Sequence, residues 1–565
     1  MRSFDTDPTV VATDARGQKL HRLSLVQNRR LSRRFYAVAP GVWTLVGNGL
    51  SNQTFIEGPE GIIAIDTGEC VEEMASALKE LRAHTQTPIA AVIYTHFHYI
   101  GGTRALFTEA GRDLPVYGHE RIAINLARVS SEIAPAYASG LVHQFGLRLP
   151  ADGPDGLCGV GLGAFFRNPD HAPFTPGGAP VTHPWRGGET ATIAGLEVQV
   201  THAPSDADDS VTLWFPALGV AVQNIIWPVL FNIFPIRGEE YRDPQVLLAG
   251  IDQVIGLGAE HLVGAHGPPI SGREEIRVRA TRSRDAIQFL WDQTVRGLNR
   301  GLTADQLASA VRLPAACDDD YLTTEFYGVA EHHVRQIAAG VRGWFDGDTA
   351  KLFPLEPVER AGRMVKGFGG ADAVRAQVRA ARDDNDLRWA LELASWLAGR
   401  GEATAEDRRL LADVLRDVGY RSSAANIRNW CLTRARDLDG SAELSRLREH
   451  RLRPQVLAAL SPREALHQLR VLLDPDRAAG LDQHIAFDFP DAARAGLHVR
   501  NGVSVATDGL GATASVRVAY SDLVAILVGK DTLTRALAEG RAELTGDEGV
   551  IRAVLACHDL PGLRD

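Results

Sequence analysis

Residues 94–102 read Tyr-Thr-His-Phe-His-Tyr-Ile-Gly-Gly, and this stretch decides how the first half of the chain folds. The residues before it, 88–93, form a short apolar run that is typical of a buried parallel strand. We therefore expect His96 and His98 where a strand ends and a loop begins, which is where open α/β sheets place their functional groups. Two imidazoles one residue apart can bind one cation through neutral ring nitrogens. A His-x-His pair alone is a weak signal, because such histidines are about equally often structural.

The composition and charge of the chain exclude several classes of protein. The chain has 565 residues, of which 45% are hydrophobic and 23% are charged. This predicts a globular protein with roughly two to four domains. The formal net charge of -10 argues against nucleic acid as the main partner, because phosphate binding needs a basic face.

The cysteines and the N-terminus indicate a cytoplasmic location. The five cysteines are far apart and form no Cys-x-x-Cys or Cys-x-His pattern, so neither a disulfide framework nor a thiolate metal site is expected, and a reducing cytosol fits. Residues 1–8 lack the basic start and continuous apolar core of a signal peptide. The most apolar stretch, 211–234, is broken by prolines and a glycine, so we expect no membrane span.

Short strand patterns recur through the first half of the chain, and several end in a polar side chain. Asp66 follows one strand, Asp206 lies in the turn between two others, and Gln223 and His266 end two more. A helical pattern at 71–84 leads from one strand to the strand before the histidine pair, as in a parallel crossover. The predicted strands cover residues 42–46, 53–56, 61–68, 197–202, 211–215, 219–224 and 261–266.

The character of the sequence changes twice along the chain. Residues 103–150 are predicted to be mostly helical, and beyond residue 272 long helices rich in Ala, Leu and Arg begin. Strand patterns return after about residue 440, at 483–489, 497–506 and 514–519. The predicted domains are 1–275, 276–440 and 441–565.

Four short motifs occur in the order in which a known fold carries its metal ligands. They are Asp66-Thr67-Gly68, His96-Phe97-His98 with Gly101-Gly102, Pro204-Ser205-Asp206 and Ala265-His266-Gly267. The chain therefore resembles the metallo-β-lactamase fold, and residues 231–238 and 343–347 extend the likeness to its alkyl sulfatase branch. The resemblance implies an α/β protein with a metallo-β-lactamase αββα sandwich, then an all-α dimerisation domain, then an α+β sterol-carrier-like domain.

The resemblance also implies a set of metal ligands. His96, His98 and Asp206 match the family's first metal site, in which Asp206 would replace a glutamate. His266 matches a histidine that binds a second metal. The ligand set could hold zinc or iron(II).

Other matched positions lie near the substrate, and two departures concern the second metal. Asn232 and Arg237 match positions near the sulfate group, where a guanidinium can meet two oxygens of an oxyanion. The family pattern His-x-His-x-Asp-His-x-Gly-Gly is two residues shorter here, so the Asp-His pair that holds the second metal is missing. Gln223, a neutral amide, replaces the bridging carboxylate, and we expect Tyr99 and Gln223 to line the pocket. One divalent metal ion per chain is therefore predicted, held by His96, His98 and Asp206, with His266 as a candidate fourth ligand.

Three functions are compatible with this sequence. The first is a metal-dependent hydrolase of an organic sulfate ester, or a related ester with a hydrophobic part, with the metal's water as nucleophile and Arg237 steadying the anionic group. The second is a mononuclear non-haem iron enzyme with redox or oxygen chemistry, because two histidines and one carboxylate are its ligand set. The third is a non-catalytic, lipid-binding dimer. We also expect a homodimer built through 276–440. Residues 441–565 are expected to form an apolar pocket for the hydrophobic part of the substrate; the alternative is that this domain only caps the dimer.

Overall fold

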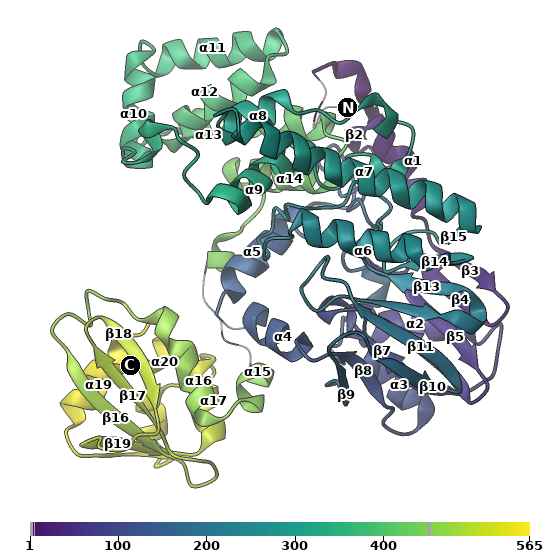
Figure 1. The fold of residues 1–565 in the computed structure, drawn as a ribbon. Coiled ribbons are helices and arrows are strands. Elements are labelled where there is room, and N and C mark those ends of the chain that lie inside the picture. Colours follow the sequence, from purple (N-terminus) through teal and green to yellow (C-terminus); the bar gives the residue numbers. More distant parts are fainter. Residues whose placement is uncertain (1–3, 5, 131, 449–451, 453, 565) are drawn as a thin grey trace. The chain divides into compact units, whose positions relative to one another are not determined.

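The computed structural model describes residue 4 and residues 6–130, 132–448, 452 and 454–564 (Figure 1). Part of the N-terminal stretch in which no signal peptide is expected, residues 1–3 and 5, lies outside this range. The chain forms two compact units, one of Met1–Ala123 and Ser139–Leu444 and the other of Ile124–Ala138 and Ser445–Asp565. Among the described residues, no helix is both long enough and apolar enough to cross a membrane.

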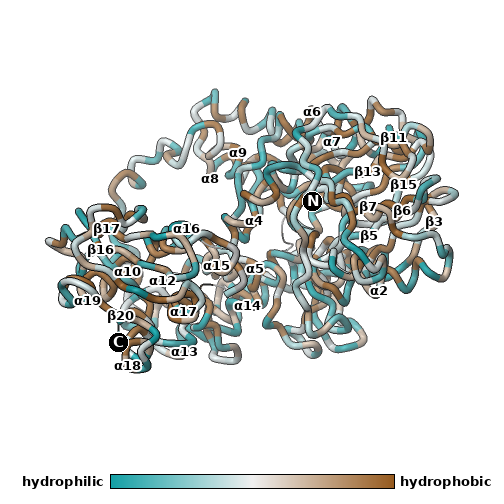
Figure 2. Tube along the Cα trace, turned by 90° about the horizontal axis from the view of Figure 1, so that it is seen from below, coloured by the Kyte–Doolittle hydropathy of each residue, from teal (hydrophilic) through white to brown (hydrophobic). Residues whose placement is uncertain are grey.

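The first unit contains two sheets, and the seven-stranded one positions the histidine pair. Its order is β3-β4-β5-β6-β7-β8-β9, and β6, β7 and β8 are parallel neighbours. Every residue of β6 and all but one of β7 are buried, as expected for parallel strands covered on both faces, and both strands are hydrophobic along their length (Figure 2). The strands are β3 (Arg34–Ala39), β4 (Val42–Val46), β5 (Gln53–Gly58), β6 (Gly61–Ile65), β7 (Ile89–Ile93), β8 (Val116–His119) and β9 (His183–Trp185).

The second sheet has six strands and supplies the acidic turn of the site. Its order is β10-β11-β12-β13-β14-β15, antiparallel except for the parallel pair β13 and β14. Apolar side chains of both sheets form one buried cluster, with Ile63 and Ile93 from the first sheet and Val200, Leu213 and Val263 from the second. The strands are β10 (Thr190–Ile193), β11 (Leu196–His202), β12 (Val211–Phe215), β13 (Val220–Gln223), β14 (His261–Gly264) and β15 (Ile270–Ser271).

Helices cover the outer faces of the two sheets. On the first sheet, α2 (Val71–Leu81) contacts β5 and α3 (Thr103–Ala110) contacts β7. On the second sheet, Leu247 of α6 (Pro244–Gly256) is buried in the same cluster as Leu262 of β14. The layers therefore run helix, sheet, sheet, helix, which confirms the predicted αββα sandwich.

A helical part follows the sandwich, as predicted. It begins with the 26-residue helix α7, and later helices bury Val374, Leu393 and Leu410 in a core of their own. Capping boxes at Thr303 and Thr404 fix the start of two of the helices. The helices are α7 (Arg273–Leu298), α8 (Ala304–Ala310), α9 (Ala330–Arg342), α10 (Pro357–Gly367), α11 (Ala371–Asp383), α12 (Leu387–Gly399), α13 (Ala405–Arg421) and α14 (Ala425–Leu438).

The C-terminal part of the second unit, from Ser445 on, is a five-stranded sheet with helices, drawn in green to yellow in Figure 1. Its order is β18-β17-β16-β19-β20. A hairpin joins β17 and β18: Arg500 pairs with Val503 across Asn501 and Gly502, whose φ values of 49° and 71° suit a two-residue turn of type I′. The elements are α15 (Pro454–Ala459), α16 (Pro462–His467), β16 (Asp482–Asp488), β17 (Ala495–Arg500), β18 (Val503–Thr507), β19 (Ala514–Val518), α17 (Tyr520–Leu527), α18 (Leu533–Ala538), β20 (Ala542–Thr545), α19 (Glu548–Ala556) and α20 (Pro561–Arg564).

The short strand β8 is the main difference from the expected elements. It lies inside residues 103–150, which were predicted to be mostly helical, and it has only four residues, too few to show a pattern. The edge strands β9 and β20 are also short and were not predicted. The remaining elements are β1 (Val11–Thr13), β2 (Lys19–His21), α1 (Arg22–Arg30), α4 (Ile122–Ser130) and α5 (Ala134–Gln144).

Candidate metal centre

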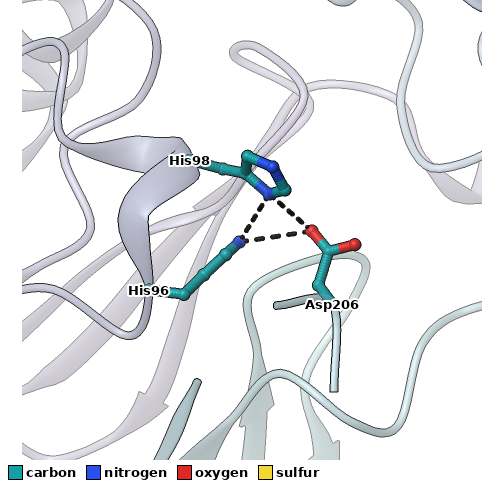
Figure 3. A group of neighbouring side chains, drawn as sticks. All are labelled: His96, His98 and Asp206. Atoms are coloured by element: carbon teal, nitrogen blue, oxygen red, sulfur yellow. Dashed lines mark hydrogen bonds and ion pairs between the residues drawn. The ribbon is translucent and has the colours of Figure 1, made fainter. Parts of the chain in front are cut away.

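Three side chains from the two sheets of the sandwich converge on one point (Figure 3). His96 follows β7, His98 lies in the short 3₁₀ helix η2 (Phe97–Tyr99), and Asp206 lies in the turn after β11. Nε2 of His96 is 3.1 Å from Nδ1 of His98 and 3.3 Å from Oδ2 of Asp206, and the last two atoms are 2.7 Å apart. Among the described residues no other group of three His, Cys, Asp or Glu side chains is arranged to hold a metal ion.

The ring of His96 is oriented by a hydrogen-bond chain that begins at Asp66. Asp66 directly follows β6 and has a φ of 55°. It accepts hydrogen bonds from the Thr95 amide at 2.8 Å and from the Thr95 hydroxyl at 2.7 Å. Because that hydroxyl donates to Asp66, its oxygen can accept a hydrogen bond from the N–H at Nδ1 of His96, 2.9 Å away. Nε2 of His96 then carries the lone pair that faces the other two ligands.

His98 lies between two carboxylates. Its Nδ1 faces Asp206, and its Nε2 is 3.6 Å from Oε1 of Glu239. Burial by itself would lower the pKa of His98, but Asp206 and Glu239 outweigh it and raise the pKa to about 9. The environment of this ring therefore favours a positive charge, which a proton or a bound cation can supply.

Asp206 presents only one of its oxygens to the histidines. Its other oxygen, Oδ1, contacts NH2 of Arg242 and lies 3.9 Å from NH2 of Arg237. Burial opposes ionisation, but Arg242 and His98 hold the pKa of Asp206 well below its usual value. Asp206 is therefore an ionised oxygen donor at neutral pH.

The donor set suits a divalent cation. Each of the three side chains has one polar atom that points away from the centre and contacts another side chain: Thr95 for His96, Glu239 for His98 and Arg242 for Asp206. The second nitrogen or oxygen of each side chain faces the centre. Two imidazole nitrogens and one carboxylate oxygen are ligands for zinc or iron(II), with positions left for water or substrate.

His266 and Tyr99 form a pair beside this centre. Nδ1 of His266 is 3.0 Å from the carbonyl oxygen of Leu50, and Nε2 is 3.2 Å from the Tyr99 hydroxyl. Burial lowers the pKa of His266 to about 4, so its ring is neutral. The ring of Tyr99 stands edge-on to His96 and His266, with centroid distances of 5.0 and 5.4 Å.

The other predicted site residues take different positions. Gln223 ends β13, and its Oε1 accepts the amides of Ile225 and Ile226 at 2.6 Å each, so its side chain closes a local turn. Asn232 is buried, and neither polar atom of its side chain has a hydrogen-bond partner among the described residues. Arg237 lies 3.3 Å from Oε1 of Glu239, at the edge of the metal ligands.

Two charged residues of the site were missed by the sequence analysis. Glu239 faces His98, and Arg242 contacts Asp206. Both follow Arg237 closely in the stretch 237–242, which reads Arg-Gly-Glu-Glu-Tyr-Arg. This dense run of charge directly after a buried apolar segment was the signal that could have indicated them.

Two family models match this chain. Residues 303–441 match the family described as alkyl sulfatase dimerisation, and residues 451–563 match the family described as alkyl sulfatase C-terminal. The two matches lie on the helical part and on the second unit.

Several relatives match most of this chain, including the sandwich. A linear primary-alkylsulfatase from Pseudomonas sp. is 33% identical over 523 residues, which are 89% of this chain and 98% of that protein. An (R)-specific secondary-alkylsulfatase from Pseudomonas sp. is 29% identical over 531 residues, 91% of this chain and 79% of that protein. The solved structure of the stereoselective inverting sec-alkylsulfatase Pisa1 from Pseudomonas sp. has a TM-score of 0.82 and 26% identity, covering 99% of this chain and 92% of that chain.

Proposed function

Because the chain belongs to the alkyl sulfatase branch of the metallo-β-lactamase superfamily, we propose that it hydrolyses organic sulfate esters that carry a hydrophobic part. The observation that carries this proposal is the convergence of Nε2 of His96, Nδ1 of His98 and Oδ2 of Asp206 beside two arginines. A metal-dependent hydrolase needs such a centre, and a sulfate ester needs the cationic groups next to it.

Some residues around the centre would bind the cation, and others would bind the substrate. A divalent cation, when bound, would polarise a sulfate oxygen and activate a water molecule. Arg237 brings a guanidinium that can steady the negative oxygens of the sulfate group. The buried amide of Asn232 offers a donor and an acceptor that no described residue uses, which suits an oxygen of the substrate.

We propose a single metal ion per chain, zinc or iron(II), held by His96, His98 and Asp206. The support comes from the residues at the position where a second metal would bind. Both ring nitrogens of His266 have partners in the protein, and Gln223 closes a backbone turn with its amide. The Asp-His pair that holds a second metal in the family is missing from this sequence. Elemental analysis of protein purified without added metal distinguishes zinc from iron.

We propose that the second unit receives the hydrophobic part of the substrate. It contains a cavity of about 820 Å³ lined mostly by apolar residues such as Leu472, Ile526, Leu527 and Leu560. Cavities of this size and lining hold small ligands, and an alkyl chain needs no polar partner along its length.

We propose a homodimer whose contact includes residues 341–358 of the dimerisation region. Phe353 is 95% exposed and Trp344 is 71% exposed, and Val341, Leu352 and Leu355 of the same segment are exposed as well. So many large apolar side chains on one short segment are unusual on a monomer surface. A second copy of this chain is the partner that the match to the dimerisation family supports.

Sulfate release from octyl and decyl sulfate tests the proposed activity. We expect release by the metal-loaded protein, loss of release after chelation, recovery on adding zinc or iron(II), and no release by His96→Ala. If the loaded protein releases no more sulfate than His96→Ala, the proposed function is wrong.

A further inference from the structure

Arg242 is a buried guanidinium at the junction of two loops of the site. It makes three polar contacts: NH2 with Oδ1 of Asp206, Nε with the backbone oxygen of Asp206 at 3.1 Å, and NH1 with the backbone oxygen of Asn232 at 2.6 Å. Its side chain is only 3% exposed, and its guanidinium carbon lies 5.6 and 5.7 Å from the ring centres of Trp227 and Phe231.

These contacts use all three nitrogens of the guanidinium. Burying such a charge is costly unless a paired carboxylate and further hydrogen bonds compensate for the lost water. Here one carboxylate and two carbonyl groups do so, and the guanidinium carbon lies over the rings of Trp227 and Phe231, which adds cation–π attraction. A lysine has one ammonium group on a flexible stem and cannot make all three contacts in this geometry.

The contacts of Arg242 join a metal ligand to a residue expected at the substrate. Because Oδ1 of Asp206 is held by Arg242, Oδ2 is the oxygen left to face His96 and His98. The contact to the Asn232 carbonyl fixes the next loop relative to the same carboxylate.

We propose that Arg242 is a positioning residue that sets Asp206 as a one-oxygen metal ligand and ties the Asn232 loop to it. This inference rests on the proposed metal centre, and it predicts that Arg242 acts on metal affinity and on substrate affinity together. Arg237 provides the contrast, because its NH2 lies 3.9 Å from the same carboxylate oxygen and 3.3 Å from Oε1 of Glu239.

The test compares Arg242→Lys and Arg242→Met with Arg237→Met. The metal dissociation constant is measured by chelator competition with zinc, and the ligand geometry is read from the visible bands of the cobalt(II) form. We expect Arg242→Met to bind zinc about 10- to 100-fold more weakly with altered cobalt bands, since partners that orient a ligand have effects of this size. Arg242→Lys should fall between Arg242→Met and the unchanged protein. Arg237→Met should raise KM and leave the cobalt bands unchanged.

A purely structural role for Arg242 gives a different result. In that case Arg242→Met lowers the melting temperature of the metal-free protein, while the folded fraction binds zinc and cobalt as the unchanged protein does. That result, or an equal loss of zinc affinity in Arg237→Met, overturns the proposal. Because metal binding is measured without substrate, weakened binding in Arg242→Met supports the proposal even if no sulfate ester is hydrolysed.

Discussion

The hydroxyl of Tyr99 lies 3.2 Å from Nε2 of His266, and Nδ1 of that ring lies 3.0 Å from the carbonyl oxygen of Leu50. A carbonyl oxygen can only accept, so Nδ1 carries the ring proton and Nε2 accepts a hydrogen bond from the tyrosine hydroxyl. His266 is therefore satisfied by the protein itself, at the position where the family resemblance implies a ligand of a second metal.

The first prediction concerns metal content. We expect one metal ion per chain, and we expect His96→Ala or His98→Ala to lose most of it, because each removes one of three ligands. His266→Ala should keep most of its metal, since both nitrogens of that ring have other partners. Elemental analysis of the purified variants measures this. Two tightly bound metal ions per chain, or equal losses in all three variants, would contradict the prediction.

The second prediction concerns pH. A cation needs the neutral form of His98, whose pKa in the metal-free protein is raised from 6.5 to about 9 because two carboxylates outweigh the effect of burial. A proton and a cation therefore compete below about pH 9, and metal affinity should rise roughly tenfold per pH unit up to that value and then level off. In the metal-free protein the raised pKa stabilises the fold fully below pH 6.5, and this stabilisation is lost as the pH rises through about 9.

Chelator competition at a series of pH values measures the first effect, and thermal unfolding of the metal-free protein measures the second. A metal affinity that does not change between about pH 7 and pH 9 would show that the proton on His98 does not compete with the cation.

The third prediction concerns alkyl chain length. Each buried methylene contributes about 0.8 kcal/mol, so affinity should rise about fourfold per added carbon until the cavity is full. Val471 lines the cavity and is 43% exposed, so Val471→Asp should reduce this rise without unfolding the unit. Val503→Asp is the matched control, because Val503 is similarly exposed in the same unit but does not line the cavity. If the affinity of the unchanged protein does not vary with alkyl chain length, or if both substitutions have equal effects, the cavity does not bind the alkyl chain.

The fourth prediction concerns assembly. Replacing Trp344 and Phe353 with serine should shift the mass measured by light scattering from dimer towards monomer, because it removes the two most exposed aromatic side chains of the 341–358 segment. Leu510→Ser is a control, since Leu510 is 69% exposed in the other unit. A double variant that keeps the dimer mass would place the contact elsewhere.

The strands and the turn that carry His96 and Asp206 can be predicted from the sequence, because the patterns that indicate them are local. The apolar run before His96 and the turn that carries Asp206 are each readable within about ten residues, and so are the strands that precede them. The strand β8 could not be read in this way, since four residues do not establish a period.

The partners of the ligands are not readable from local pattern. Arg242 reaches Asp206 across 36 residues, and Tyr99 reaches His266 across 167 residues. Such contacts depend on how the two sheets pack, and a single sequence gives no measure of that packing. The family resemblance named His266 as a metal-site position, but only the three-dimensional arrangement pairs it with Tyr99.

The three proposed ligands come from opposite halves of the sandwich: the two histidines follow a strand of the first sheet, and Asp206 follows a strand of the second. A cation bound by all three would link the two sheets, since His98 and Asp206 are 108 positions apart in the sequence. Any ion that binds the folded state alone adds to its stability by mass action, about 2.7 kcal/mol at a free concentration 100 times the dissociation constant. The concentration of free metal in the cell would then affect the stability of the folded protein as well as its activity.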